Sequence, residues 1–557
     1  MGRQSGKENV KKSCAGLLAH VDAGKTTLSE SMLLSAGVIR KGGRVDHGDS
    51  FLDYDAQERS RGITIFSKQA ILTWKGTEFT FIDTPGHVDF SAEMERTLSV
   101  LDYAVVLISG TDGVQPHTET IWKLLELYHI PAFIFVNKMD INGADFDNVV
   151  NMIRERLKAN AMPLQLPIGK EENFKGIVDV IKMKAYFYND PTGMSVDEGE
   201  IPADIRARAE QARADLVEFV AGRDDVLMEK FLEGKEISVE EIKAGVRSAV
   251  IALELNPVFC GTAYKNKGIQ LLLDAITDYL PSPIDIDHVV GFNPDEPEKE
   301  EERKADDNEP FCGLAFKIVS DPFVGKLSFI KVLSGKVTSD LSLRDVRMSS
   351  TDKLGRMYTM CGKKNTEVKE ACCGDIVAIG KMEWKTGDTV CDPKHEVELP
   401  AIELAEPCYS MAISPKTKGQ DDKVASGLAR LNEEDISFTL VNNAETHQMV
   451  ISGAGDIQVD VLCAKLKSRF GVETELKPAR VAYREKIKGK VEAHGRHKKQ
   501  SGGSGQFGDV WIRFEPQDES DDMIFEEEVF GGSVPKNFFP SVEKGLRNAV
   551  QKGVLAG

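Results

Sequence analysis

The amino-acid sequence predicts a multidomain protein in which an α/β domain is followed by a β-rich domain and by smaller domains of mixed α and β structure. The chain has 557 residues, and at about one to two hundred residues per domain this length predicts about three to five domains. Short apolar runs alternate with helical segments up to residue 285, and β-rich runs separated by Gly and Asp follow residue 311.

The composition indicates ordinary apolar cores and an acidic surface. Hydrophobic residues make up 41% of the chain, and the formal net charge is −19. This acidity argues against a protein that wraps nucleic acid with its whole surface, although it leaves room for a local basic patch. Nine scattered cysteines without a CxxC pair argue against a disulfide framework or a zinc site and favour a reducing, cytoplasmic location. No apolar stretch has the length of a membrane helix or follows the pattern of a signal peptide, so we expect no membrane contact.

The first predicted domain covers residues 1–285. Its apolar runs are continuous instead of alternating, which indicates strands buried on both faces, as in a parallel sheet with crossover helices. These runs are CAGLLAH, FTFIDT, YAVVLIS and PAFIFVN, beginning at residues 14, 79, 103 and 131. An insertion at about residues 164–256 brings its own strands and charged helices.

Three further segments follow this domain. Residues 286–403 contain short strands with the spacing of a small closed β-barrel, together with an acidic stretch at 294–310 that we expect to be a solvated linker. Residues 404–480 follow a βαββαβ order, which is typical of the ferredoxin-like fold. Residues 481–557 begin with strands, pass a glycine-rich hairpin and end on an amphipathic helix, as in part of an α+β domain.

The strongest motif is AHVDAGKT at residues 19–26, between an apolar strand and a helix. In this setting, backbone N–H groups of the loop and the helix N-terminus can wrap phosphates. Lys25 would reach the β- and γ-phosphates, and the Thr26 hydroxyl would bind Mg²⁺. The position of the usual first glycine is occupied by alanine. The predicted phosphate-binding residues are Ala19, His20, Val21, Asp22, Ala23, Gly24, Lys25, Thr26 and Thr27.

A second motif, DTPGH, ends a predicted strand at residues 83–87. Asp83 could hold the magnesium shell through water, and Gly86 would let its N–H approach the γ-phosphate because no Cβ is in the way. His87 stands where a side chain could orient an attacking water. The simpler alternative is a tight turn with an incidental histidine. The residues assigned to the nucleotide site here are Asp83, Thr84, Pro85, Gly86 and His87.

The third motif, NKMD at residues 137–140, indicates which base is bound. Asp140 can accept hydrogen bonds from guanine N1–H and the exocyclic amino group. Adenine has no such donor pair and would leave a buried carboxylate unpaired, which almost excludes an ATP-dependent enzyme. Asn137 would tie this loop to the phosphate loop, and the Lys138 stem would cover the ring. The predicted base-pocket residues are Asn137, Lys138, Met139, Asp140, Gly261, Thr262 and Ala263.

Together these motifs resemble those of the translational GTPases. AHVDAGKTTL, RGIT, DTPGHVDF, NKMD and GTAYKNKG are all present. The resemblance covers the whole chain and narrows to elongation factor G, whose successive domains are similar to KIVSDPFVGKLSFIKVLSG, ISGAGDIQVDVL and QSGGSGQFGDVWIRFEP. It implies a P-loop GTPase domain with an insert, a β-barrel domain II, a ferredoxin-like domain III and the N-terminal part of an α+β domain IV.

The resemblance also implies an activity and its partners. GTP would be hydrolysed to GDP and phosphate under stimulation by the ribosome, and hydrolysis would promote translocation of tRNA and mRNA. Thr64 in RGIT would be a second hydroxyl on Mg²⁺, His87 would position the hydrolytic water, and Asp22 would help to place a monovalent cation. No arginine finger stands beside the motifs, so ribosomal RNA is expected to complete the site. We expect a monomer that contacts ribosomal RNA and proteins.

Residues 484–499 are basic although the chain as a whole is acidic. They contain seven Lys or Arg residues and two Glu. Such a segment suits contact with RNA phosphates, although a solvated strand pair would look the same. Because domain IV of elongation factor G enters the decoding region, the resemblance favours contact with tRNA and mRNA there. His494 and His497 have no carboxylate or thiol partner nearby in the sequence, so we expect no metal site.

Two alternative functions stay open. The nucleotide-binding part also resembles the ribosomal protection proteins that expel tetracycline, but those lack the usual QSGGxGQ hairpin, which is present here. The other alternative is a ribosome-binding regulator that uses its GTPase as a timer and does not translocate. The family continues beyond GVLAG into the rest of domain IV and a fifth domain. We therefore expect a C-terminally incomplete chain that is competent for GTP and impaired in translocation.

Overall fold

The computed structural model describes residues 11–43, 50–279, 288–296, 298–321, 324–517 and 522–551. The predicted domain boundary at 285–286 and the last residues, 552–557, lie outside these ranges. Contacts divide the chain into two compact units. The first comprises Met1–Tyr409, Thr417–Thr439 and Ser452–Thr474, and the second comprises Ser410–Lys416, Leu440–Ile451 and Glu475–Gly557.

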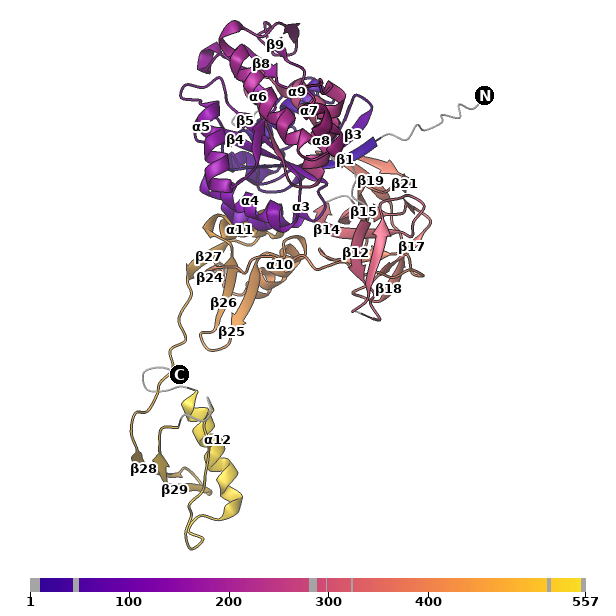
Figure 1. The fold of residues 1–557 in the computed structure, drawn as a ribbon. Helices are drawn as coiled ribbons and strands as arrows, with labels where there is room; N and C mark the ends of the chain where they lie inside the picture. Colours follow the sequence, from indigo (N-terminus) through magenta and orange to yellow (C-terminus); the bar gives the residue numbers. More distant parts are fainter. Residues whose placement is uncertain are drawn as a thin grey trace. The chain divides into compact units, whose positions relative to one another are not determined.

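A seven-stranded sheet forms the centre of the nucleotide domain (Figure 1). Its order is β2-β3-β1-β4-β5-β11-β6, and all neighbours are parallel except β2, which runs antiparallel to β3. The four continuous apolar runs form β1, β3, β4 and β5, as predicted. The strands are β1 (Lys11–Ala19), β2 (Lys68–Trp74), β3 (Thr77–Asp83), β4 (Tyr103–Ser109), β5 (Ala132–Asn137), β6 (Ala161–Pro163) and β11 (Asn256–Cys260).

Helices cover both faces of this sheet. Helices α1 (Lys25–Ser35) and α9 (Ile269–Tyr279) share one apolar core with the strand residues of one face. Helices α3 (Ser91–Leu98), α4 (Pro116–Leu127) and α5 (Phe146–Met152) pack into the core on the other face. In such doubly wound sheets the loops at the carboxyl ends of the strands meet at one edge, where ligands bind.

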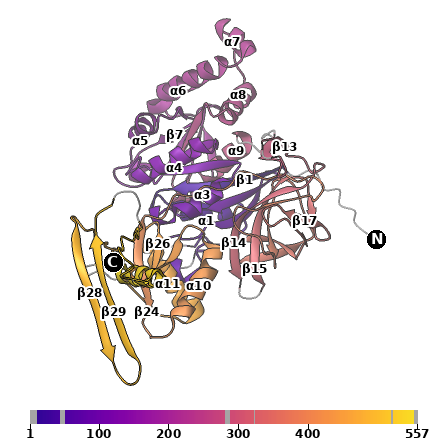
Figure 2. The same ribbon diagram turned by 90° about the horizontal axis from the view of Figure 1, so that it is seen from below.

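Between β6 and β11 the chain forms a subdomain of its own (Figure 2). An antiparallel sheet in the order β10-β9-β8-β7 is followed by three helices, of which α6 packs against α7 and α8. The short helix α7 was not predicted. The elements are β7 (Gln165–Ile168), β8 (Gly176–Asp179), β9 (Lys184–Phe187), β10 (Asp197–Gly199), α6 (Ala203–Ala221), α7 (Asp225–Leu232) and α8 (Val239–Ile251).

The next domain is an eight-stranded antiparallel sheet that encloses its own apolar core, as the barrel prediction requires. The sheet order is β18-β17-β23-β14-β15-β22-β19-β20, and β16 and β21 form a separate pair. The strands are β14 (Cys312–Asp321), β15 (Gly325–Ser334), β16 (Val337–Thr338), β17 (Ser342–Asp345), β18 (Ser350–Lys353), β19 (Met357–Cys361), β20 (Lys364–Val368), β21 (Glu370–Ala371), β22 (Ile376–Gly380) and β23 (Thr389–Cys391).

The acidic stretch at 294–310 differs from the linker that its composition predicts. Strand β12 (His288–Phe292) pairs with β13 (Glu300–Lys304) in an antiparallel hairpin, so part of the stretch is regular structure. Phe292 also pairs with Glu398, which fixes the hairpin to the end of the barrel domain. Backbone pairing forms β13, and its charged side chains are compatible with an exposed edge strand.

One buried ion pair and one partly exposed ion pair join the barrel to the nucleotide domain. The Asp102 carboxylate accepts hydrogen bonds from the backbone N–H of Cys14 at 2.6 Å and from Lys331 Nζ at 3.2 Å. Both charged side chains are at most 5% exposed. A second pair joins Lys12 to Asp375 at 2.7 Å. Because buried charges are tolerated only when paired, the contact between Asp102 and Lys331 depends on both domains being in place.

The following segment has the predicted βαββαβ order. Its strands form a sheet in the order β25-β26-β24-β27, which is the ferredoxin-like arrangement. Helices α10 and α11 belong to the first unit. The elements are β24 (Tyr409–Pro415), α10 (Asp421–Glu434), β25 (Thr439–Asn443), β26 (Gln448–Gly453), α11 (Asp456–Phe470) and β27 (Thr474–Pro478).

The last described elements lie in the second unit. Strands β28 (Val491–Gln500) and β29 (Gly505–Phe514) form the predicted glycine-rich hairpin, in which Gln500 pairs with Gly505. Helix α12 (Phe539–Val550) follows, as predicted. Among the helices that the structure describes, none combines the length and the apolar character needed to cross a membrane.

Candidate nucleotide-binding site

The predicted phosphate loop curls tightly between β1 and α1. Asp22 and Gly24 both have left-handed backbone conformations, with φ of 62° and 93°. A Cβ on Gly24 would lie only 2.5 Å from Asn137 Nδ2, so both conformation and space require glycine there. No side chain caps the first turn of α1. Its N–H groups and the turns of the loop are therefore suited to binding phosphate.

Hard oxygen atoms converge beside this loop. Thr26 Oγ1 lies 3.1 Å from Thr64 Oγ1 and 3.4 Å from Asp83 Oδ2, and all three residues are buried. Lys25 Nζ donates to Asp83 Oδ1 at 2.6 Å. Burial raises the pKa of the Asp83 carboxyl, and the Lys25 ammonium opposes this effect. Two hydroxyls and a carboxylate are the ligand types that Mg²⁺ prefers, so the residues present fit this ion.

Thr64 is positioned by charged residues that sequence reasoning missed. Its hydroxyl donates to Asp53 Oδ2 at 3.2 Å, and Lys68 forms ion pairs with both Asp53 and Glu58. The other oxygen of Glu58 accepts from the backbone N–H of Ile65 at 3.0 Å. These side chains are almost fully buried. The segment before Thr64 therefore folds around a buried ionic cluster, which the run of charges on both sides of RGIT could have suggested.

Asn137 joins the predicted base pocket to the predicted phosphate loop, as expected. Its Nδ2 donates to the carbonyl of Ala23 at 2.8 Å, and its Oδ1 accepts from the N–H of Ala263 at 2.9 Å. The N–H of Met139 donates to the carbonyl of Gly261 at 3.2 Å. The structure thus brings together the three predicted groups of residues at 19–27, 137–140 and 261–263.

The Asp140 carboxylate lies at this same place and is 9% exposed. Lys265, which sequence reasoning missed, forms an ion pair with it at 2.9 Å. Burial alone would raise the pKa of Asp140, but the hydrogen bond from Lys265 lowers it below its usual value. Asp140 is therefore an ionised acceptor at neutral pH, as recognition of the guanine donors requires.

The DTPGH segment packs directly on the phosphate loop. A Cβ on Gly86 would lie 3.1 Å from the carbonyl of Ala19 and 3.3 Å from the N–H of Val21, so the two backbones are in close approach. The hydroxyl of Thr84 donates to the carbonyl of Leu17 at 2.8 Å. These contacts hold the following residue, His87, next to the loop.

The His87 side chain is 27% exposed and is fixed at one ring nitrogen. Its Nδ1 accepts a hydrogen bond from the backbone N–H of Asp89 at 3.2 Å. The hydrogen-bond pattern therefore assigns the proton of the neutral ring to Nε2. This leaves Nε2 as the ring nitrogen that can donate.

A second buried imidazole, missed by sequence reasoning, lies near the phosphate loop. His117 on α4 is 3% exposed, and its ring centroid lies 6.2 Å from that of His20. Among the described atoms, neither ring nitrogen of His117 has a hydrogen-bond partner. Burial, with a smaller contribution from His20, lowers the pKa of His117 to about 4, so the ring is neutral at physiological pH.

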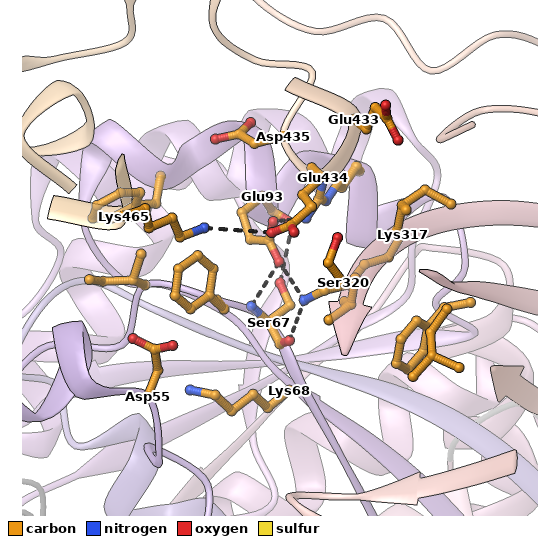
Figure 3. Close-up of a pocket in the computed structure, with 18 of the residues that line it drawn as sticks. Asp55, Ser67, Lys68, Glu93, Lys317, Ser320, Glu433, Glu434, Asp435 and Lys465 are labelled. Atoms are coloured by element: carbon orange, nitrogen blue, oxygen red, sulfur yellow. Dashed lines mark hydrogen bonds and ion pairs between the residues drawn. The ribbon is translucent and has the colours of Figure 1, made fainter. Parts of the chain in front are cut away.

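A large cavity lies elsewhere in the first unit. It has a volume of about 780 Å³ and is lined by β2, β14 and residues of α10 and α11, but by none of residues 19–27 (Figure 3). Glu93 accepts from the N–H of Ser67 at 2.9 Å and from Lys317 Nζ at 2.7 Å, and it pairs with Arg96. Burial would raise the pKa of Glu93, but Arg96 and Lys317 lower it to about 2. The cavity thus lies where three domains meet through buried charges.

In the comparison with known proteins, successive segments of the chain match domains of translation elongation factors. Residues 12–282 match the Elongation factor Tu GTP binding domain, and residues 310–393 match Elongation factor G domain 2. Residues 404–478 and 479–557 match domains III and IV of elongation factor G. A crystal structure of a protein from Thermus thermophilus is similar over 98% of this chain and 79% of that one, with 30% sequence identity and a TM-score of 0.84.

The GTP-binding domain match implies that the chain binds GTP or GDP, typically with Mg²⁺. The site geometry agrees, because Thr64 and the residues of the predicted phosphate loop and base pocket lie together. With the GTP-binding domain followed in order by domains 2, III and IV, the chain belongs to the translational GTPases and has the architecture of elongation factor G.

Proposed function

We propose that this protein hydrolyses GTP to GDP and phosphate on the ribosome and that hydrolysis promotes movement of tRNA and mRNA. The observation that carries the proposal is the convergence of Thr26, Thr64 and Asp83 beside the phosphate loop. These residues come from separate segments, and a site for a nucleotide with its metal ion explains why they meet. The order of the matched domains supports the ribosome as the partner.

Residues from each of the predicted motifs have a role in this proposal. The N–H groups of the phosphate loop and Lys25 hold the β- and γ-phosphates. Thr26 and Thr64 would hold Mg²⁺ directly and Asp83 would hold it through water. The ion supplies neutralising charge for phosphoryl transfer. Asn137, Lys138 and Asp140 hold guanine. The exposed turn at Asp22 is the proposed place for a monovalent cation.

His87 is proposed to orient the attacking water. The water oxygen attacks the γ-phosphorus while the bond to the bridging β–γ oxygen breaks, and the proton leaves with the phosphate product. Because Nδ1 of His87 already accepts a hydrogen bond, Nε2 is the ring nitrogen proposed to donate to the water. Its contribution is therefore orientation, and ribosomal RNA is proposed to complete the site.

The β28–β29 hairpin is the proposed contact with RNA in the decoding region. All residues of β28 are exposed, and Arg496, Lys498 and Lys499 supply positive charge. The ring of Trp511 is stacked on His494 with centroids 4.5 Å apart, and Trp511 is 71% exposed. Exposed cations next to exposed aromatic rings suit phosphate contact and base stacking. A monomer acting in the cytoplasm fits this role, and the nine cysteines are free thiols.

The deciding experiment is a single-round translocation assay on programmed ribosomes, run together with GTP hydrolysis. We expect ribosomes to stimulate hydrolysis by this chain and GTP to support movement of tRNA and mRNA. Stimulated hydrolysis without movement would favour the regulator. Release of tetracycline from stalled ribosomes would favour ribosomal protection. The glycine-rich turn between Gln500 and Gly505 favours translocation over protection, since the QSGGxGQ hairpin is typical of elongation factor G.

A further inference from the structure

One residue connects the proposed hydrolysis site to a helix of the third domain. The backbone N–H of Asp89 donates to Nδ1 of His87 at 3.2 Å. The carboxylate Oδ2 of the same residue accepts from the backbone N–H of Ile457 at 2.9 Å and of Gln458 at 3.4 Å. Ile457 lies 368 residues further along the chain, in the first turn of α11. Asp89 thus holds the His87 ring with its backbone N–H and the helix with its Oδ2, while its Oδ1 lies 3.5 Å from Nδ1 of His87.

Helix α11 depends on this carboxylate for its N-terminal cap. Its N-cap residue, Gly455, has no side chain to accept from the first turn. The Ile457 N–H is shared with its neighbour Asp456 at 3.0 Å. Asp89 supplies the further acceptor from another domain, and its negative charge is favourable at a helix N-terminus.

Gly455 is needed for this contact for a steric reason and not because of its backbone conformation. Its backbone is extended, with φ of −163° and ψ of −179°, which any residue can adopt. A Cβ at this position would lie 2.3 Å from the atoms of the Asp89 carboxylate. An alanine here would therefore push the carboxylate away without straining its own backbone.

An apolar cluster holds the same elements together. Ile65, Phe90 and Val461 are buried against one another, and Ile63, Phe66 and Ile457 pack on them. The cluster therefore joins α11 to the residues that follow Thr64 and to the residue that follows Asp89. The side chain of Gln458 in turn donates to Asp435 at 3.1 Å and to Ser437 at 2.7 Å, which ties the start of α11 to the end of α10.

We propose that Asp89 is a positioning residue for GTP hydrolysis, which acts through His87 and does so while α11 is docked. With the carboxylate held by the helix, the Asp89 N–H stays directed at Nδ1 of His87. The ring then keeps its orientation and keeps its proton on Nε2, toward the attacking water. Hydrolysis is thereby coupled to the position of the third-domain helices. This inference rests on the proposed function of His87.

The first test compares GTP hydrolysis by the full chain in single turnover, with ribosomes and saturating GTP. Asp89→Ala removes the carboxylate that accepts from the first turn of α11. Gly455→Ala keeps this carboxylate but pushes it away from the helix. We expect each to slow hydrolysis by about tenfold or more, with the GTP dissociation constant changed by less than about twofold. Gly455→Ala should have no effect in the Asp89→Ala background, because its Cβ then meets no carboxylate.

Two further variants sharpen this comparison. Asp89→Asn keeps an oxygen that accepts from the helix, so it should recover most of the rate. Gly222→Ala is the matched control, since its Cβ would meet nothing closer than 3.5 Å. Additive effects of Asp89→Ala and Gly455→Ala would overturn the proposed contact between them.

A second test separates positioning from a structural role. In the His87→Ala background, Asp89→Ala should leave the residual hydrolysis rate unchanged, because Asp89 acts through that ring. Equal slowing in both backgrounds would overturn the proposal, and so would a normal rate in all Asp89 and Gly455 variants. If the unchanged chain hydrolyses no GTP with ribosomes, the proposed function itself fails. That outcome is therefore distinct from failure of the Asp89 role.

Discussion

The hydroxyl oxygens of Thr26 and Thr64 lie 3.1 Å apart although the residues belong to different segments. Thr26 is in the first turn of α1, whereas Thr64 is held from its other side by Asp53. In octahedral magnesium sites, neighbouring oxygen ligands are about 3 Å apart. The spacing of the two hydroxyls therefore suits ligation of one ion by both.

Replacing Thr26 should make nucleotide binding less dependent on magnesium. We expect Thr26→Ala to weaken binding of GTP by about ten- to a hundredfold in the presence of Mg²⁺, because a ligand to a charged centre is lost. With the metal chelated, the variant and the unchanged chain should bind equally. Titration with a fluorescent GTP analogue measures this, with Thr120→Ala on α4 as the control. Equal affinity in the presence of Mg²⁺ would contradict the metal role.

Replacing Asp140 should change the preferred base. Asn offers an N–H donor where Asp offers only acceptors, which matches the C2 carbonyl of xanthine. We expect Asp140→Asn to lower affinity for GTP by about a hundredfold or more and to favour xanthosine triphosphate. Competition binding measures the preference. Asp145→Asn, which keeps the cap of α5, is the control. Retained GTP preference would rule out this pocket as the guanine site.

Removing the His87 ring should separate binding from turnover. We expect His87→Ala to leave GTP affinity nearly unchanged and to lower ribosome-stimulated turnover by about 10²- to 10⁴-fold. The reason is that the ring is directed at water and makes no phosphate contact in this proposal. Steady-state hydrolysis with and without ribosomes provides the measurement. His395→Ala in the barrel domain is the control, and unchanged turnover would refute the assigned role.

Neutralising Glu93 should reduce stability in a pH-dependent way. The pKa of Glu93 is lowered to about 2 in the folded protein, below about 4.3 for an unperturbed Glu. Its stabilising effect is therefore fully present above about pH 4.3 and is lost as the pH falls through 2. Glu93→Gln should lower the free energy of unfolding by about 3 kcal/mol at pH 7, since Lys317 loses its buried partner.

Urea unfolding at a series of pH values measures this effect. The difference between the unchanged chain and Glu93→Gln should become smaller below pH 4. Glu210→Gln on the exposed face of α6 is the control and should differ little at any pH. A difference that stays constant down to acid pH would contradict the ionised, paired state of Glu93.

Local features of the sequence predicted much of how the motif residues come together. Buried strands such as β4 and β5 are continuous apolar runs, and the motifs stand at their carboxyl ends, so their convergence follows from the parallel sheet. The contacts of Asn137 illustrate this, because its partners Ala23 and Ala263 belong to neighbouring loops of the same sheet edge.

Contacts between domains could not be predicted in the same way. Lys317 and Glu93 are 224 residues apart, and Asp89 and Ile457 are 368 apart. Nothing in the pattern around either partner specifies the other, since the packing of the domains decides the pairing. Strand β13 was missed for a related reason. Its sequence, EEERK, has the composition of a linker, and only pairing with β12 makes it a strand.

The buried pair of Asp102 and Lys331 has a consequence for how these domains can diverge. If the barrel carried no cation at this place, the interface would bury the Asp102 carboxylate with no compensating charge, and the two-domain assembly would be strongly destabilised. Exchange of either domain with an unrelated one would meet the same electrostatic penalty. The two domains should therefore be inherited as one unit, with positions 102 and 331 changing together among relatives.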